Sequence, residues 1–139
     1  MRTTKALWMI VAAIFVVGGA LAIWGPGPER KPEVKARIIA VKADASDPED
    51  IKRAREKIQE TYDFLRKGAS FEQLARNRSE ADSARDGGDM GWIGRGTLSA
   101  DLEEVVFSLK PGEFSEILEQ KRAEDIVYRI LYVEQRRHF

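Results

Sequence analysis

The densest group of unusual residues in this chain is a glycine-rich segment, because five of the eleven glycines fall within residues 87–96. Backbone N–H groups of glycine-rich loops can cradle a phosphate, but such loops are followed by lysine and then serine or threonine at a helix start. That pair is missing here. The glycines instead indicate a chain that leaves a loop, enters a central strand and turns into a helix, which calls for positive φ or close backbone approach. Trp92 in that strand is expected in the core.

Other side chains offer little chemistry by themselves. The single histidine, His138, lies one residue from the C-terminus, where a solvated position is expected rather than a catalytic or metal-binding role. Glu103 and Glu104 fall on a predicted helix and are expected on its hydrated face. The chain has no cysteine, which removes disulfides and thiolate metal ligands. We expect neither a metal nor a cofactor.

Composition limits the architecture and the partners. A chain of 139 residues, 43% hydrophobic and 33% charged, supports one ordinary globular domain. Its 23 basic and 23 acidic residues cancel, so no positive field attracts a nucleic-acid backbone. Nucleic acid is therefore not an expected partner.

An apolar N-terminal segment predicts membrane attachment. The nineteen residues Ala6–Trp24 carry no charge, and as a helix they would span about 28 Å at ~1.5 Å per residue. Trp8 and Trp24 lie near the two ends, where indole rings favour the headgroup zone. The alternative is a cleaved signal peptide, because residues 20–22 have the small-x-small form of a cleavage site. The apolar run continues past that site, which favours an uncleaved anchor that contacts lipid through residues 6–24.

The flanks of this segment give a tether and an orientation. Basic residues occur on both sides, so the positive-inside count does not decide the topology. We favour a single-pass arrangement with the N-terminus inside and the folded domain on the extracytoplasmic, periplasmic side. Residues 25–32 hold three prolines and two glycines, which exclude both helix and regular sheet and leave a short stiff tether.

Hydrophobic spacing predicts the elements that position the glycine-rich segment. A first strand is expected over Val34–Val41, where apolar residues begin by alternating with charged ones. Asp47 is an N-cap followed by proline and acids, which starts a helix that runs to Gly68. Ser70 opens a second helix with a capping-box sequence. The remaining predictions are a helix from about Ser99 to Leu109 and two strands, Phe114–Leu118 and Ile126–Val133.

The order strand, helix, helix, strand, helix, strand, strand resembles the parvulin family of peptidyl-prolyl isomerases. The resemblance covers about Val34–Glu134. It rests on Gly-Gly-Asp-Met-Gly-Trp-Ile at 87–93, Phe-Ser-Leu at 107–109, Lys-Pro-Gly-Glu at 110–113, and Ser115.

This resemblance implies an α+β fold, with a four-stranded sheet flanked by about three helices and preceded by one transmembrane helix. The implied organisation is an anchor at 1–24, a tether at 25–33, a parvulin-like domain at 34–134 and a C-terminal tail at 135–139.

The chemistry implied is rotation about an X-Pro bond, whose barrier is ~18–20 kcal/mol, without a covalent intermediate or cofactor. Such a site needs an apolar pocket for the proline ring and polar groups around the twisted amide. The resemblance assigns pocket walls to Met90 and Leu98, and a third wall, usually phenylalanine, to the smaller Leu102.

The polar positions depart from the family pattern. The first-strand histidine of the family falls on Ile38, and the cysteine or aspartate of the loop falls on Ala81, whose neighbour Asp82 substitutes only if the loop shifts. The last-strand histidine falls on Asp125 in a gapless alignment, or on Arg129 if residues 120–124 contain an insertion. Asp82 and Asp125 are thus the catalytic candidates, and both are weak.

Two functions follow from this pattern. The first is a membrane-anchored isomerase or chaperone domain that binds proline-containing extracytoplasmic polypeptides, with weak or lost catalysis. The alternative is a non-catalytic accessory or scaffolding subunit of a larger integral membrane protein complex. The altered polar positions favour the alternative on catalytic grounds, whereas the apolar walls are compatible with both.

Overall fold

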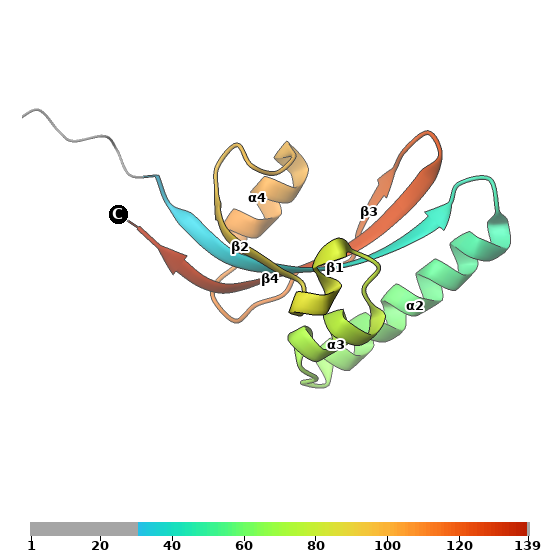
Figure 1. Ribbon diagram of the computed structural model, residues 1–139, viewed down its shortest axis with the longest axis horizontal. Helices are drawn as coiled ribbons and strands as arrows, with labels where there is room; N and C mark the ends of the chain where they lie inside the picture. The colour runs from blue at the N-terminus through green and yellow to red at the C-terminus, as the bar shows by residue number, and fades with distance from the viewer. Residues whose placement is uncertain (1–30, 139) are drawn as a thin grey trace, which may run out of the picture. The chain divides into compact units, whose positions relative to one another are not determined.

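The computed structural model describes residues 31–138, which form a four-stranded antiparallel sheet with helices on both faces (Figure 1). The spatial order of the strands is β2-β1-β4-β3. The strands are β1 (Glu33–Asp44), β2 (Asp89–Gly94), β3 (Leu118–Lys121) and β4 (Asp125–Arg137). The helices are α2 (Pro48–Arg66), α3 (Phe71–Arg78) and α4 (Ala100–Ser108), with a 3-10 helix, η1 (Asp82–Asp86). The expected α+β class and element order are confirmed.

The predicted anchor at residues 6–24 lies outside the described residues, as does the alternative cleavage site. Within residues 31–138, no helix is both long enough and apolar enough to cross a membrane. Anchoring therefore stays a prediction from the sequence.

The core has two layers, one on each face of the sheet. Helices α2 and α3 cover one face, and α4 covers the other (Figure 1). On the α2/α3 face the buried residues include Ile39, Val41, Ala54, Ile58, Leu65, Phe71, Tyr128 and Ile130. On the α4 face they are Val34, Ala36, Ile93, Val106, Leu131 and Val133. Strands β1 and β4 are thus apolar on both sides, because each is covered twice.

The predicted helix starts are confirmed. The Asp47 carboxylate accepts hydrogen bonds from the backbone N–H groups of Glu49 and Asp50, and Pro48 is the first residue of α2. The Ser70 hydroxyl accepts from the N–H of Gln73 at the start of α3. These side chains accept hydrogen bonds from N–H groups that have no partner within the helix. The residues next to each helix start are therefore enough to predict where α2 and α3 begin.

The strand expected over Phe114–Leu118 is wrong. Phe114 forms only an isolated bridge with Tyr132, and β3 begins at Leu118. The Ser115 hydroxyl accepts a hydrogen bond from the N–H of Leu131 at 2.9 Å, while the Ser115 N–H donates to the Leu131 carbonyl at 2.8 Å. In a regular antiparallel pair, the Leu131 N–H would donate to a backbone carbonyl, but here it donates to the Ser115 hydroxyl. Regular strand pairing with β4 therefore begins only at β3.

The glycine-rich segment was predicted to form a central strand of the sheet, and this prediction is wrong. The segment forms β2, which lies at one edge of the sheet. Gly91 has φ of 70°, which interrupts the alternation of side chains, so both Met90 and Ile93 pack toward the α4 face. Trp92 is left 37% exposed instead of lying in the core. The Arg137 guanidinium lies over its ring, 4.0 Å from the centroid.

Strand β4 extends past the expected end of the domain at Glu134. Lys35 pairs with Gln135 and Ala36 pairs with Val133, so Glu134 is an extra residue in a bulge. Pairing then continues to Arg137, in the segment expected to be a tail. Glu33, the last residue of the expected tether, is likewise the first residue of β1.

Candidate active site

The three predicted wall residues meet on the α4 face of the sheet. Met90 of β2, Leu98 of the following loop and Leu102 of α4 all pack against the buried cluster of that face. Each is only partly buried, so each has surface left for a ligand. Ile38 of β1 and Leu118 of β3 share this surface. We call these five residues the α4-face site.

Close backbone approach positions Met90 against β1. The Ile38 N–H donates to the Gly88 carbonyl at 2.9 Å, and a Cβ on Gly88 would lie 2.3 Å from the Ile38 carbonyl oxygen. Only glycine fits there, at φ of 80°. The Asp89 carboxylate accepts from the Gly91 N–H at 2.8 Å and supports the next turn. The glycines that the sequence marked as unusual thus place the first wall of the site.

Glu103 holds the loop that carries Leu98. Its carboxylate accepts from the Gly96 N–H at 2.8 Å and from the Arg95 guanidinium at 3.3 Å. The Glu103 side chain is only 18% exposed, so its expected place on a hydrated face is wrong, whereas Glu104 is exposed as expected. A carboxylate that binds a loop N–H is structural, and this loop lies directly before Leu98.

The loop before the glycines is fixed to β1 by polar contacts that the sequence did not predict. The Ser79 hydroxyl accepts from the N–H groups of Ala40 at 3.1 Å and Ala81 at 3.2 Å. The Glu80 N–H donates to the Ala40 carbonyl at 2.7 Å. The loop therefore follows β1 as an irregular continuation of the sheet edge, which holds Ala81 in place.

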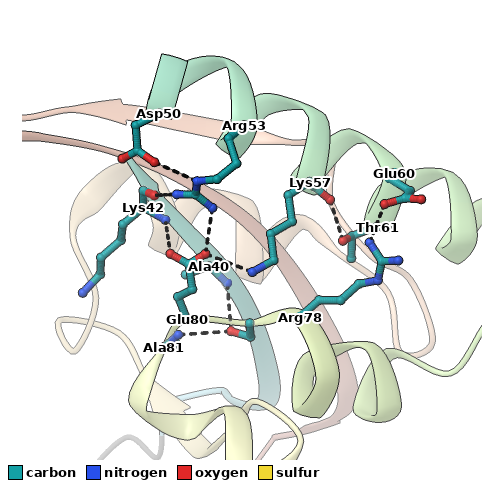
Figure 2. Close-up of polar contacts among 11 residues, drawn as sticks. Ala40, Lys42, Asp50, Arg53, Lys57, Glu60, Thr61, Arg78, Glu80 and Ala81 are labelled. Carbon is teal, nitrogen blue, oxygen red and sulfur yellow. Dashed lines mark hydrogen bonds and ion pairs between the residues drawn. The ribbon is translucent and has the colours of Figure 1, made fainter. Parts of the chain in front are cut away.

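Glu80 also connects this loop to α2, as Figure 2 shows. Its carboxylate accepts from the Lys42 N–H at 3.2 Å and from the Lys57 ammonium at 3.1 Å, and lies 3.5 Å from the Arg53 guanidinium. Arg53 in turn binds the Asp50 carboxylate at 2.7 Å. The network joins α2, β1 and the loop.

The weak candidate Asp82 is the first residue of η1, and its side chain is exposed. Ala81 is the N-cap residue of that helix and makes no side-chain hydrogen bond to it. Ile38 is partly buried and apolar. Neither Ala81 nor Ile38 offers a side-chain hydrogen bond, as the sequence indicated, and Asp82 stays a prediction.

The two possible alignments of the family's last-strand histidine, on Asp125 or on Arg129, fall at different points of the β3–β4 hairpin. Asp125 is the first residue of β4; its carbonyl accepts from the Arg122 N–H at 2.8 Å, and its carboxylate lies 3.9 Å from the Arg122 guanidinium. Arg129 pairs with Leu118 on one side and Ala40 on the other. It is thus Arg129 that lies opposite a residue of the α4-face site.

Arg129 is a half-buried cation on the α4 face. Its guanidinium Nη1 donates to the Gln120 amide oxygen at 2.6 Å. Burial lowers its pKa, as does the charge of Arg122, while Asp101 and Asp125 act in the opposite direction. The charge of Asp101 acts on the Arg129 guanidinium, and Asp101 directly precedes Leu102. The guanidinium is therefore near the start of α4, which carries the third wall residue. Alternation along β4, in which Leu131 and Val133 face α4, is the signal that assigns Arg129 to this face.

A separate hollow of about 410 Å³ opens on the α2/α3 face. Phe71 and Tyr132 stack in its wall with ring centroids 5.1 Å apart. Arg37 and Glu134 form an ion pair at its edge. None of the predicted site residues lines this hollow, and no sequence motif indicated it.

Comparisons with known proteins agree with the fold. Residues 38–134 match the rotamase family model, described as the PPIC-type PPIASE domain. The chaperone SurA of Burkholderia pseudomallei is 38% identical over 96 residues, which cover 68% of this chain and 21% of that protein. The chain thus matches about a fifth of the length of this curated relative.

Two solved structures share the fold. A PpiC-type peptidyl-prolyl cis-trans isomerase domain has a TM-score of 0.62 and 28% identity, and the match covers 78% of this chain and 94% of that one. PrsA from Bacillus subtilis has a TM-score of 0.58 and 29% identity, with 74% of this chain and 35% of that one covered. The first match spans nearly an entire solved domain, so residues 31–138 contain the elements of a complete domain of this type.

Proposed function

Because this chain belongs to the rotamase family of PPIC-type peptidyl-prolyl isomerases, we propose that its folded domain binds proline-containing segments of extracytoplasmic polypeptides at the α4-face site. The domain acts there as an isomerase and chaperone, with weak catalysis. The observation that carries the proposal is the convergence of Met90, Leu98 and Leu102, from three consecutive segments, on one partly exposed apolar surface.

The surface suits a proline ring for a simple physical reason. Proline presents apolar ring carbons, and its burial against aliphatic side chains is worth about 25 cal/mol for each Å² removed from water. Met90 contributes a flexible thioether that adapts to irregular shapes. Leu102 contributes less area than the phenylalanine that the family carries there, so the ring is held more weakly. Binding without tight complementarity fits a chaperone that accepts many sequences.

Catalysis on this surface rests on differential binding. Rotation about the X-Pro bond breaks amide resonance, so a site that holds the ring while the preceding carbonyl turns favours the twisted form. Neither Ile38 nor Ala81 contributes a polar group to this step. We therefore expect a rate enhancement well below that of a site with the full set of polar side chains.

Membrane attachment and location belong to the same proposal. The uncharged residues 6–24 precede the domain by only a few residues, and SurA, a curated relative, is named a chaperone. We propose a single-pass anchor that holds the domain on the extracytoplasmic side. Alkaline carbonate extraction of membranes tests the anchor, because a chain released into the supernatant contradicts it. The mass of the mature chain shows whether residues 1–22 have been removed.

Peptide binding is tested with the full chain in mild detergent by NMR titration with a proline-containing tetrapeptide, and exchange between the cis and trans peptide signals gives the isomerisation rate. Met90→Ala and Leu102→Ala are expected to weaken peptide binding about tenfold or less, since each removes two or three buried methylene equivalents. The matched control is Leu74→Ala, which removes the same side chain from the α2/α3 face. Equal loss in Leu102→Ala and Leu74→Ala would contradict the assignment of the site.

A second candidate function is supported by Trp92 on the edge strand β2. An exposed indole beside an edge strand is a surface that protein partners bind, which suits an accessory subunit of a membrane protein complex. Solubilisation in mild detergent followed by sizing tests this candidate. Co-migration with a partner that Trp92→Ala abolishes supports it, and a monomer unaffected by the substitution counts against it.

A further inference from the structure

We propose that Arg129 is the catalytic polar group of the α4-face site, with its guanidinium donating a hydrogen bond to the prolyl amide as that amide twists. This inference rests on the proposed function, because it needs a prolyl peptide on the α4 face. It goes beyond that function by assigning catalysis to a cation. At the other two positions where the family carries polar side chains, this chain has the apolar residues Ile38 and Ala81.

The first step is position. Arg129 lies in β4 between Leu118 of β3 and Ala40 of β1, on the face toward α4. Leu118 belongs to the α4-face site, and Ala40 is two residues along β1 from Ile38, which also belongs to it. A peptide seated on the site therefore has Arg129 at the border of its binding surface.

The second step is donor capacity. A guanidinium has five N–H donors in a planar fork, and among the described residues Arg129 uses one of them, from Nη1 to Gln120 at 2.6 Å. That bond orients the plane of the group and leaves the other donors for a ligand. In the part of the chain that the structure describes, Arg129 has no carboxylate within 4.0 Å, so its charge is not neutralised by direct contact.

The third step is the chemistry of the twisted amide. In the planar ground state the nitrogen lone pair is delocalised into the carbonyl, and rotation localises it on the prolyl nitrogen. An N–H donor aimed at this nitrogen binds the twisted form better than the planar one, which lowers the barrier. A charged donor in a half-buried position is stronger than a neutral one. No bond to the protein forms, and no proton leaves the guanidinium.

The charge of Arg129 also predicts the pH profile. Burial lowers its pKa, but a guanidinium stays protonated throughout the physiological range. The charged groups that face it are Asp101 on α4, and Asp125 and Arg122 of the hairpin. A hydrogen bond from Ser99 lowers the pKa of Asp101, which keeps that carboxylate ionised near neutrality. The isomerisation rate is therefore expected to be flat from about pH 5 to 8, the range in which a histidine would titrate.

The experiment uses the full chain in mild detergent with succinyl-Ala-Leu-Pro-Phe-4-nitroanilide as the probe. NMR exchange spectroscopy gives the cis-trans rate, and titration of the same peptide gives its dissociation constant. Arg129→Gln is expected to lower the catalysed rate by about tenfold or more while the dissociation constant changes by less than about twofold. Arg129→Lys, which keeps the charge but loses the fork, is expected to recover part of the rate.

The control is Arg66→Gln, which removes an exposed arginine of α2 on the other face of the sheet and is expected to leave the rate unchanged. Circular dichroism melts of all variants show whether they are folded. Loss of peptide binding in folded Arg129→Gln, or an unchanged rate, would overturn the assignment. A wild-type chain that binds the peptide at Met90 but never accelerates its exchange would overturn it too, while leaving peptide binding intact. Absence of both binding and exchange would instead contradict the proposed function itself.

Discussion

The two faces of the sheet use the same strands for different purposes. On the α2/α3 face, the nineteen residues of α2 and the eight of α3 cover strands β1 and β4, and residues such as Ile39, Ile58 and Ile130 are at most 2% exposed. On the α4 face, a single helix of nine residues covers less of the sheet. Met90, Leu98 and Leu102 therefore stay partly exposed there.

The α2/α3 face supplies most of the stability, whereas the α4 face leaves an apolar surface open to a ligand. Burial on the α2/α3 face removes large side chains from water and holds the sheet together. The α4 face has its own small core, but it ends in a rim of apolar side chains that a ligand can cover. A domain of this size can leave one apolar surface partly open because the other face supplies much of its stability.

The largest expected effect is on the α2/α3 face. Ile130→Ala leaves a cavity in a fully buried position of β4, and we expect the free energy of unfolding to fall by about 2–5 kcal/mol. The comparison variant is Leu102→Ala on the α4 face, which should cost clearly less because that side chain is partly exposed. Urea unfolding followed by circular dichroism measures both. Equal losses would mean that the two faces contribute alike to stability.

Two glycines of the glycine-rich segment distinguish contact from backbone strain. Gly88→Ala places a Cβ 2.3 Å from the Ile38 carbonyl oxygen at φ of 80°, so the loop must move away from β1. Gly91→Ala has φ of 70° but no atom within 4 Å, so only the strain of about 1–2 kcal/mol remains. We expect Gly88→Ala to be the more destabilising by at least about 1 kcal/mol. Thermal melts give the ranking, and the reverse order would show that close approach does not fix the loop.

A larger side chain in the wall of the α4-face site tests the proposed binding surface directly. Leu102→Phe adds an aromatic ring at a partly exposed position, so overpacking is avoided and unfolding should change by no more than about 0.5 kcal/mol. Peptide affinity is expected to rise about threefold to tenfold, because the ring adds contact area for proline. Isothermal titration with a proline-containing peptide measures the gain. An affinity that does not rise would indicate that the ring of the ligand does not reach Leu102.

The smallest expected effect is the acid sensitivity of the α2 end. Hydrogen bonds from the Asp44 N–H and the Arg53 guanidinium lower the pKa of Asp50 below the usual value of an aspartate. A lowered folded pKa means that the stabilisation is present above the unfolded pKa and is lost as the pH falls through the folded value. Asp50→Asn should therefore lower Tm slightly at pH 7 and have less effect at pH 3. An equal fall at both pH values would show that the carboxylate charge is not involved.

Most elements of the fold followed from local sequence. The caps at Asp47 and Ser70 predicted the starts of α2 and α3 within a residue, alternation located β1, and β-branched and aromatic content located β4. These signals work because they depend on neighbours a few residues apart. The strand expected at Phe114 failed because its pairing partner is Tyr132, eighteen residues away, and a serine hydroxyl takes part in the contact.

The wall positions and the polar group of the candidate site differ in how far the sequence reached. The resemblance to the parvulin family assigned Met90, Leu98 and Leu102 as walls, and in the structure all three pack against one buried cluster. The sequence left Asp125 and Arg129 as alternatives, because the length of the hairpin decides the register. The contacts of Ser79 and Glu80 with β1 could not be predicted from the sequence either, because they join segments about 40 residues apart.

Local sequence was enough to predict the helices, the main strands and the need for glycine at positions 87, 88 and 91, because caps, periodicity and positive φ depend on near neighbours. Strand order and register, which the folded sheet alone shows, set which strand lies at the edge, why Trp92 is exposed and which side chain of β4 lies opposite Leu118. These depend on strand order, a bulge at Glu134 and hairpin register, which arise from pairing between distant segments. One residue of register reverses every side chain of a strand, so only the assembled sheet could assign Arg129 to the α4 face.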